Sequence, residues 1–148
     1  MGKNNRKNKL NKSDLQRKSG ELPQKNEGLK KPQKIVFGIS LLDNLQGQDY
    51  EDWEENKFLS KALSKLQGLC SMTMNEAKQQ QIIKEYTSKI PEGSTFEHPK
   101  HIAEHINWAS IRVQGKIRII GFVEENYIFQ IVFLDKEHEF YPSVKKNT

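Results

Sequence analysis

The sequence predicts an α+β domain in which a helical hairpin packs on a small antiparallel sheet, in the order strand–helix–helix–strand–strand–strand. Residues 116–134 form two apolar runs joined by Glu124-Glu125-Asn126, a connection of hairpin length. Residues 58–70 place apolar side chains at three- and four-residue steps, which is typical of an amphipathic helix. Residues 1–34 contain no aromatic residue and few aliphatic ones, so we expect a disordered tail before the domain.

The sheet is predicted from four apolar segments. Residues 127–134 carry apolar side chains on both faces, so this strand should lie inside the sheet. Residues 108–113 and 116–123 are strand candidates joined by a tight turn at Gln114-Gly115, and residues 35–42 form the first strand. Short turns between consecutive strands require antiparallel pairing.

The two helices are predicted between the first strand and the last three. Acidic residues in the segment 49–55 suit the start of a helix over residues 53–67, which Gly68 can end. Thr73 and Glu76 match a capping box, so a second helix should run from Met74 to about Ser88.

Charge divides the 148 residues into two parts. Residues 1–34 hold eleven of the 24 Lys and Arg residues and three of the 19 acids, a net charge of +8. The remaining 13 bases and 16 acids give −3. We therefore expect a basic tail (1–34) and a folded domain (35–148). The tail would attract RNA or DNA by releasing counterions, through Lys3, Arg6, Lys7, Lys9, Lys12, Arg17, Lys18, Lys30, Lys31 and Lys34. The alternative is a solubilising extension.

The remaining sequence features argue against a membrane-spanning, secreted or disulfide-bonded protein. No segment approaches the ~20 apolar residues that span a bilayer, and the N-terminal residues lack the apolar region of a secretory signal. One cysteine, Cys70, excludes an internal disulfide, and its place on the apolar helix face suggests packing. We expect a cytoplasmic protein without a membrane partner or cofactor.

In topology and in its C-terminal third, the chain resembles the RelE/ParE-like toxin superfamily. The segments that carry the resemblance are IRIIGF, YIFQIVFLD and HEFY. In the mRNA-cleaving members, a basic residue on the penultimate strand and a His or Arg near a Tyr after the last strand orient the 2′-OH, neutralise the phosphate and protonate the leaving oxygen. The resemblance places Arg118 on the strand that faces the phosphate, and His138 and Tyr141 at the end of the sheet. It also implies the ribosome and an antitoxin protein as partners.

The chemistry of RNA cleavage points to the same residues. The reaction needs a base near the 2′-OH, cations at the phosphate and a proton donor for the leaving group. His138 titrates near neutral pH, Arg118, Arg112 and Lys136 could supply cations, and Tyr141 a donor. The alternative is structural: Arg118 pairs with a cross-strand Glu, His138 lies in a surface turn and Tyr141 packs its ring.

A histidine cluster suggests a second kind of site. His101-Ile102-Ala103-Glu104-His105 matches H-x-x-E-H, which on a helix places two imidazoles and a carboxylate together as in inverzincin peptidases. His98 is the nearby third histidine, and Pro99 allows only a short helix. The alternatives are an adventitious or structural metal site, or none.

These observations lead to one functional hypothesis and one alternative. The first is a toxin-like endoribonuclease that cleaves mRNA at the ribosome. The alternative is a non-catalytic module of the same fold that binds nucleic acid or a protein through its basic tail.

Overall fold

The computed structural model describes residues 31–143. The chain divides into two units, Met1–Pro32 and Gln33–Thr148, and only the second contains described helices and strands. Its elements are β1 (Val36–Gly38), α2 (Tyr50–Glu54), η4 (Glu55–Lys57), α3 (Phe58–Leu69), α4 (Met74–Gln79), β2 (Ile83–Glu85), β3 (Trp108–Gln114), β4 (Ile117–Glu124) and β5 (Ile128–Asp135). Residues 1–30 of the predicted disordered tail lie outside the described residues. Of its basic residues, only Lys31 and Lys34 are therefore described.

The five strands form one sheet in the order β1-β5-β4-β3-β2. The strand β5 lies between β1 and β4, which agrees with its apolar side chains on both faces. The strands β2 to β5 pair antiparallel, but β1 runs parallel to β5, with Val36 opposite Ile128. The sheet is therefore mixed, and the prediction of an antiparallel sheet is correct only for β2 to β5.

The helical hairpin is the main correction to the predicted fold. The helix expected over residues 53–67 is divided into α2, η4 and α3, because Asn56 and Lys57 adopt left-handed backbone angles. The second helix has the predicted capping box at Thr73 and Glu76, but it ends at Gln79 instead of near Ser88. Gln81 is left-handed, with φ of 59°, and the chain then enters β2. One main helix, α3, covers the sheet.

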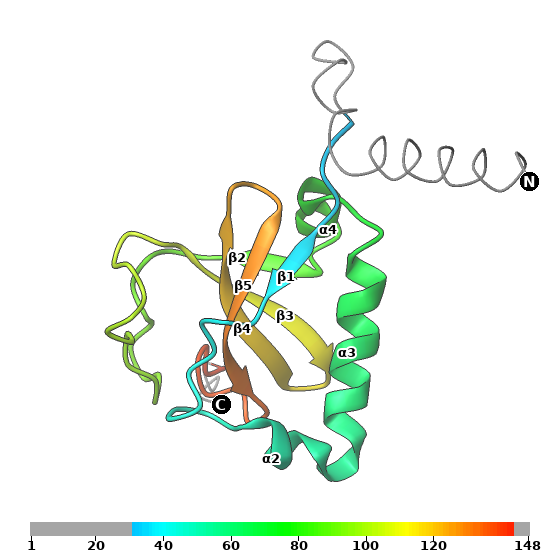
Figure 1. The fold of residues 1–148 in the computed structure, drawn as a ribbon. Helices are drawn as coiled ribbons and strands as arrows, with labels where there is room; N and C mark the ends of the chain where they lie inside the picture. The colour runs from blue at the N-terminus through cyan, green and yellow to red at the C-terminus, as the bar shows by residue number, and fades with distance from the viewer. Residues whose placement is uncertain (1–30, 144–148) are drawn as a thin grey trace, which may run out of the picture. The chain divides into compact units, whose positions relative to one another are not determined.

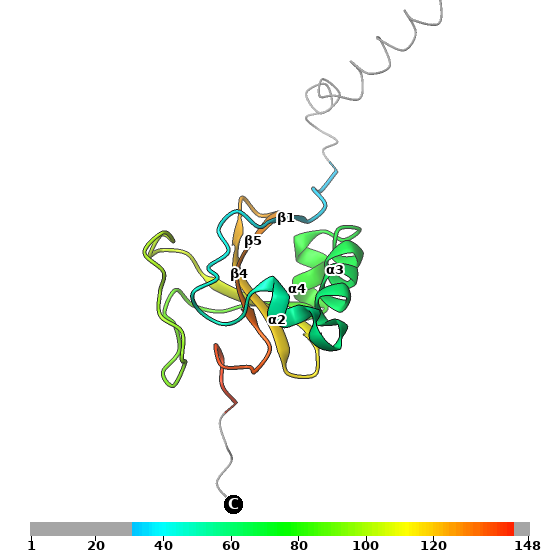
Figure 2. The same cartoon turned by 60° about the horizontal axis from the view of Figure 1, so that its bottom comes forward.

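The sheet is the middle layer of three (Figures 1 and 2). On one face, α3 and α4 close a core that contains Trp53, Ile83, Ile111 and Ile119. On the other face, the long connection between β2 and β3 packs an aromatic core against the sheet, including Phe96. This second covering is partial, and it leaves the ends of β2, β3 and β4 near the β3–β4 turn accessible.

A short segment after β5, residues 136–141, folds back over this second face and is called the C-terminal loop below. Asp135, the last residue of β5, holds it: one carboxylate oxygen accepts the backbone N–H of Glu139 (3.0 Å) and the other that of Phe140 (2.9 Å). The Phe140 ring is fully buried in the aromatic core. The loop is thus anchored near its C-terminal end.

Within residues 31–143, none of the helices combines the length and the hydrophobicity needed to cross a membrane.

Candidate functional site

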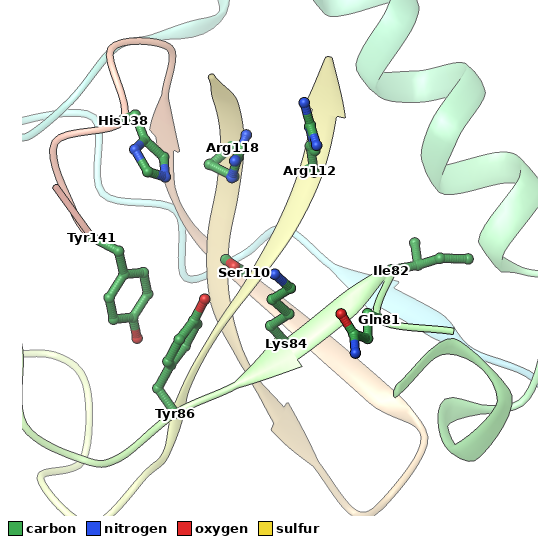
Figure 3. Close-up of a pocket in the computed structure, with 9 residues that line it drawn as sticks. All are labelled: Gln81, Ile82, Lys84, Tyr86, Ser110, Arg112, Arg118, His138 and Tyr141. Carbon is green, nitrogen blue, oxygen red and sulfur yellow. The ribbon is translucent and has the colours of Figure 1, made fainter. Parts of the chain in front are cut away.

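The open part of the second sheet face contains a cavity of about 420 Å³ (Figure 3). Its walls come from the segment before β2, from β2, β3 and β4, and from the C-terminal loop. The lining residues are Gln81, Ile82, Lys84, Tyr86, Ser110, Arg112, Arg118, His138 and Tyr141. Four of the five residues predicted to be catalytic are therefore brought together: Arg112, Arg118, His138 and Tyr141.

Two arginines form the cationic end of the cavity. Arg112 on β3 and Arg118 on β4 are directly opposite in the antiparallel register, so their side chains leave the same face of the sheet. Arg112 Nε and Arg118 Nη1 both donate to the carbonyl oxygen of Gly115 in the turn between the strands, at 3.0 Å and 2.6 Å. Burial, and next the charge of Arg112, lower the pKa of Arg118 from its ordinary value. Two guanidinium groups held this close favour an anion between them.

The acidic residues near the cavity are engaged elsewhere. Glu137 pairs with Lys116 at 2.7 Å, and Glu85 pairs with Lys78 at 3.1 Å. Asp135 is buried and accepts the two backbone N–H groups of the C-terminal loop. Among residues 31–143, no carboxylate lies within ion-pair distance of either arginine, and none lines the cavity. The expected alternative, an Arg118–Glu pair, is absent from this part of the chain.

His138 enters the cavity from the C-terminal loop, where its backbone is left-handed with φ of 58°. Burial, followed by the charge of Arg118, lowers the pKa of His138 below its ordinary value, and Asp135 opposes this effect. The imidazole is therefore neutral at pH 7, the form that accepts a proton. The hydroxyl of Ser143 lies 3.4 Å from Nδ1, which leaves Nε2 as the other nitrogen for a ligand.

Two tyrosines form the aromatic end of the cavity. The rings of Tyr86 and Tyr141 are 3.9 Å apart between centroids and inclined by 31°. The Tyr141 hydroxyl is buried and has no hydrogen-bond partner within the described residues. Burial, and then the neighbouring Tyr86, raise the pKa of Tyr141, so its hydroxyl remains protonated. It is therefore a hydrogen-bond donor without an acceptor among the described residues.

Five lining residues were not predicted from the sequence as site residues: Gln81, Ile82, Lys84, Tyr86 and Ser110. Lys84 and Ser110 face each other across β2 and β3, and Ser110 is among the few buried polar residues. The sequence analysis assigned Lys84 and Tyr86 to a helix. In the structure Ile83 and Lys84 belong to the strand β2, where they point to opposite faces of the sheet, and Tyr86 directly follows that strand. The polar Ser110 inside an otherwise apolar strand was the one available signal.

Lys136 does not line this cavity. Its backbone N–H donates to Gln48 Oε1 at 2.6 Å, and the same oxygen accepts a hydrogen bond from the Trp53 indole at 3.1 Å. This bond ties the start of the C-terminal loop to the segment before α2. The structure thus separates Lys136 from the other four predicted catalytic residues.

The histidine cluster does not form the expected geometry. Residues 99–105 contain turns and no helix, so the H-x-x-E-H spacing does not place His101 and His105 on one helical face. His98 Nε2 lies 2.9 Å from the carbonyl oxygen of Ile102, and His101 Nε2 lies 2.8 Å from that of Leu41. Over residues 31–143, no three His, Cys, Asp or Glu residues are arranged to hold a metal ion. Cys70 is exposed at the end of α3, which corrects the prediction that it packs in the core.

The cavity combines fixed positive charge, a neutral imidazole and hydroxyl donors. Such a set can bind a phosphate group through the arginines and move a proton through the histidine. The fold places these groups on strand ends and on an anchored loop, where their relative positions are held.

Comparison with known proteins gave no match: no family model, no curated protein and no solved structure is significantly similar to this chain.

Proposed function

We propose that this protein is a toxin-like endoribonuclease of the RelE/ParE type that cleaves mRNA, at the ribosome, and is controlled by an antitoxin protein. One observation carries the proposal: the Arg112–Arg118 pair, free of acidic partners among residues 31–143, shares a cavity with His138 and Tyr141. The resemblance of the C-terminal third to that superfamily supplies the identity of the substrate.

The cavity residues suffice for cleavage by the neighbouring 2′-OH. His138, neutral at pH 7, removes the 2′-OH proton while the O2′–P bond forms and the P–O5′ bond breaks. The arginines stabilise the charge that develops on the phosphorus oxygens. The leaving 5′ oxygen takes a proton from a cationic side chain, for which Lys84 is the candidate. The products are a 2′,3′-cyclic phosphate and a 5′-hydroxyl.

The direct test is cleavage of RNA by the purified chain, with free RNA and with a message bound to ribosomes. Arg118→Ala should lower the rate by about 10²–10³-fold because a fixed charge at the transition state is lost. His138→Ala should lower it by about 10²–10⁴-fold because the base is lost. Lys116→Ala and His105→Ala are matched controls, since they remove a cation and an imidazole that do not line the cavity.

A second test uses growth. Induced expression should arrest growth and deplete messages, and the Arg118→Ala/His138→Ala double variant should abolish both effects. Equal toxicity of the native chain and the double variant would refute the assigned roles. Normal growth, with salt-sensitive binding of RNA that disappears when residues 1–34 are deleted, would instead support a non-catalytic module that binds through its tail.

A further inference from the structure

Asp135 does not line the cavity, but it is hydrogen-bonded to the loop that carries His138 and Tyr141. It is opposite Arg118 in the β4–β5 register, so both side chains leave the same face of the sheet. Its exposed fraction is 1%, so its charge is removed from solvent. A buried carboxylate is costly unless its oxygens are hydrogen-bonded.

The hydrogen bonds of Asp135 explain the path of the C-terminal loop. Its two oxygens accept the N–H groups of Glu139 and Phe140, four and five residues further along the chain. His138 lies immediately before these residues, in a left-handed conformation that is uncommon for a residue with a Cβ. Tyr141 lies immediately after them. The carboxylate thus binds the backbone between the two loop residues that line the cavity.

We propose that Asp135 is the positioning residue of this site: its buried carboxylate holds the C-terminal loop against the end of β5, so that His138 and Tyr141 lie over the Arg112–Arg118 pair. The catalytic consequence of this inference rests on the proposed function. The positioning itself does not, because it can be measured without a substrate.

The experiment compares the native chain with Asp135→Asn, which keeps one acceptor oxygen, and Asp135→Ala, which keeps none. Glu137→Gln is the matched control, because it removes one negative charge from the same loop without a bond to its backbone. Amide hydrogen exchange followed by NMR should show both Glu139 and Phe140 exchanging roughly tenfold faster or more in Asp135→Ala, and at least one of them in Asp135→Asn, with the β3–β4 amides unchanged. Native protection of both amides in Asp135→Asn would overturn the proposal; this variant decides the question if Asp135→Ala does not fold.

The titration of His138 gives a second readout. Several charged and titratable groups face it. They are Lys84 from β2, Tyr86 just after β2, Arg112 from β3, Arg118 from β4, and Asp135, Glu137, Glu139 and Tyr141 from β5 and the loop, with Lys116 beside Glu137. If the loop leaves the sheet, His138 loses its burial and its proximity to Arg118, so its pKa should rise toward that of a free histidine in Asp135→Asn. A pKa that falls or stays would mean that the loop remains in place without the carboxylate, and would refute the positioning role.

Activity separates this inference from the proposed function. In the Asp135→Asn variant kcat for RNA should fall by roughly tenfold or more while KM stays nearly constant, because the arginines stay on their strands. If the native chain cleaves no RNA, the proposed function fails, whereas the exchange and titration results still decide the role of Asp135.

Discussion

Arg112 and Arg118 lie opposite each other on neighbouring strands, and both donate a hydrogen bond to the carbonyl oxygen of Gly115. The turn that joins the strands therefore fixes the two guanidinium groups on one side of the sheet. Gly115 has φ of 52°, a conformation that glycine adopts without steric cost. The carbonyl offsets part of the repulsion between the two cations, and an anion would offset the rest.

Inorganic phosphate or sulfate should therefore stabilise the protein. A ligand that binds only the folded state at one hundred times its dissociation constant adds ~2.7 kcal/mol to the free energy of unfolding. Arg112→Gln and Arg118→Gln should each remove most of the increase in Tm that phosphate causes. Lys116→Gln should retain it, since Lys116 pairs with Glu137 outside the cavity. Equal phosphate effects in all three variants would show that the anion binds elsewhere.

Stability should fall as the pH is lowered through the range in which His138 titrates. Because the folded state lowers the pKa of His138, the unfolded chain binds the proton more readily. The contribution of His138 to the free energy of unfolding is therefore complete above its unfolded-state pKa of about 6.5. It is lost as the pH falls toward the lower pKa of the folded state. Urea unfolding at several pH values should show a shallower pH dependence for His138→Gln than for the native chain. If the free energy of unfolding had the same pH dependence in both proteins, the pKa of His138 would not be lowered by folding, since the other histidines are common to both.

Replacing Tyr141 by Phe should separate stability from activity. The hydroxyl is buried without a partner among the described residues, so its removal should leave the free energy of unfolding unchanged or raise it by about 1 kcal/mol. RNA cleavage should nevertheless decrease, because a donor to the substrate is lost. Tyr50→Phe is the control, since Tyr50 is 41% exposed and does not line the cavity. A destabilised Tyr141→Phe variant would show that the hydroxyl has a structural partner.

Gly121 should be intolerant of a side chain. A Cβ there would lie 1.9 Å from the backbone oxygen of Gln130 and 2.8 Å from the Phe129 ring, and neither can move easily inside the sheet. Gly121→Ala should therefore destabilise the fold by roughly 1–3 kcal/mol or more in chemical denaturation. Gly38→Ala should cost less, because the nearest atoms belong to the Gln130 side chain, which can rotate. Equal costs at both positions would contradict this account.

The last three strands could be predicted because their signals are local. Alternating or continuous apolar residues and the turns at Gly115 and Asn126 determine β3, β4 and β5, and Asn126 has the left-handed angle that such turns need. The pairing of β1 with β5 depends on residues about ninety positions apart in the chain, as for Val36 and Ile128. No local pattern specifies that contact or its parallel direction.

The second helix was overextended because Ile82 and Ile83 suit both a helical stripe and a strand. The left-handed backbone at Gln81 decides between them, and glutamine gives no signal for it. Because the helix was extended to about Ser88, Lys84 and Tyr86 were not recognised as cavity residues. Arg112, Arg118, His138 and Tyr141 were found because they lie on strands and a loop that the sequence placed correctly, whereas Lys136 was included only because it is a cation nearby in the chain.

The β1–β5 pairing also bears on how the molecule assembles. The hairpin that carries both arginines joins residues close in the chain, and we expect it to form early. The strand β5 is complete only when the distant β1 has docked beside it, and contacts over such separations slow folding. A partly folded chain would thus already carry the arginine pair before β1 completes the sheet.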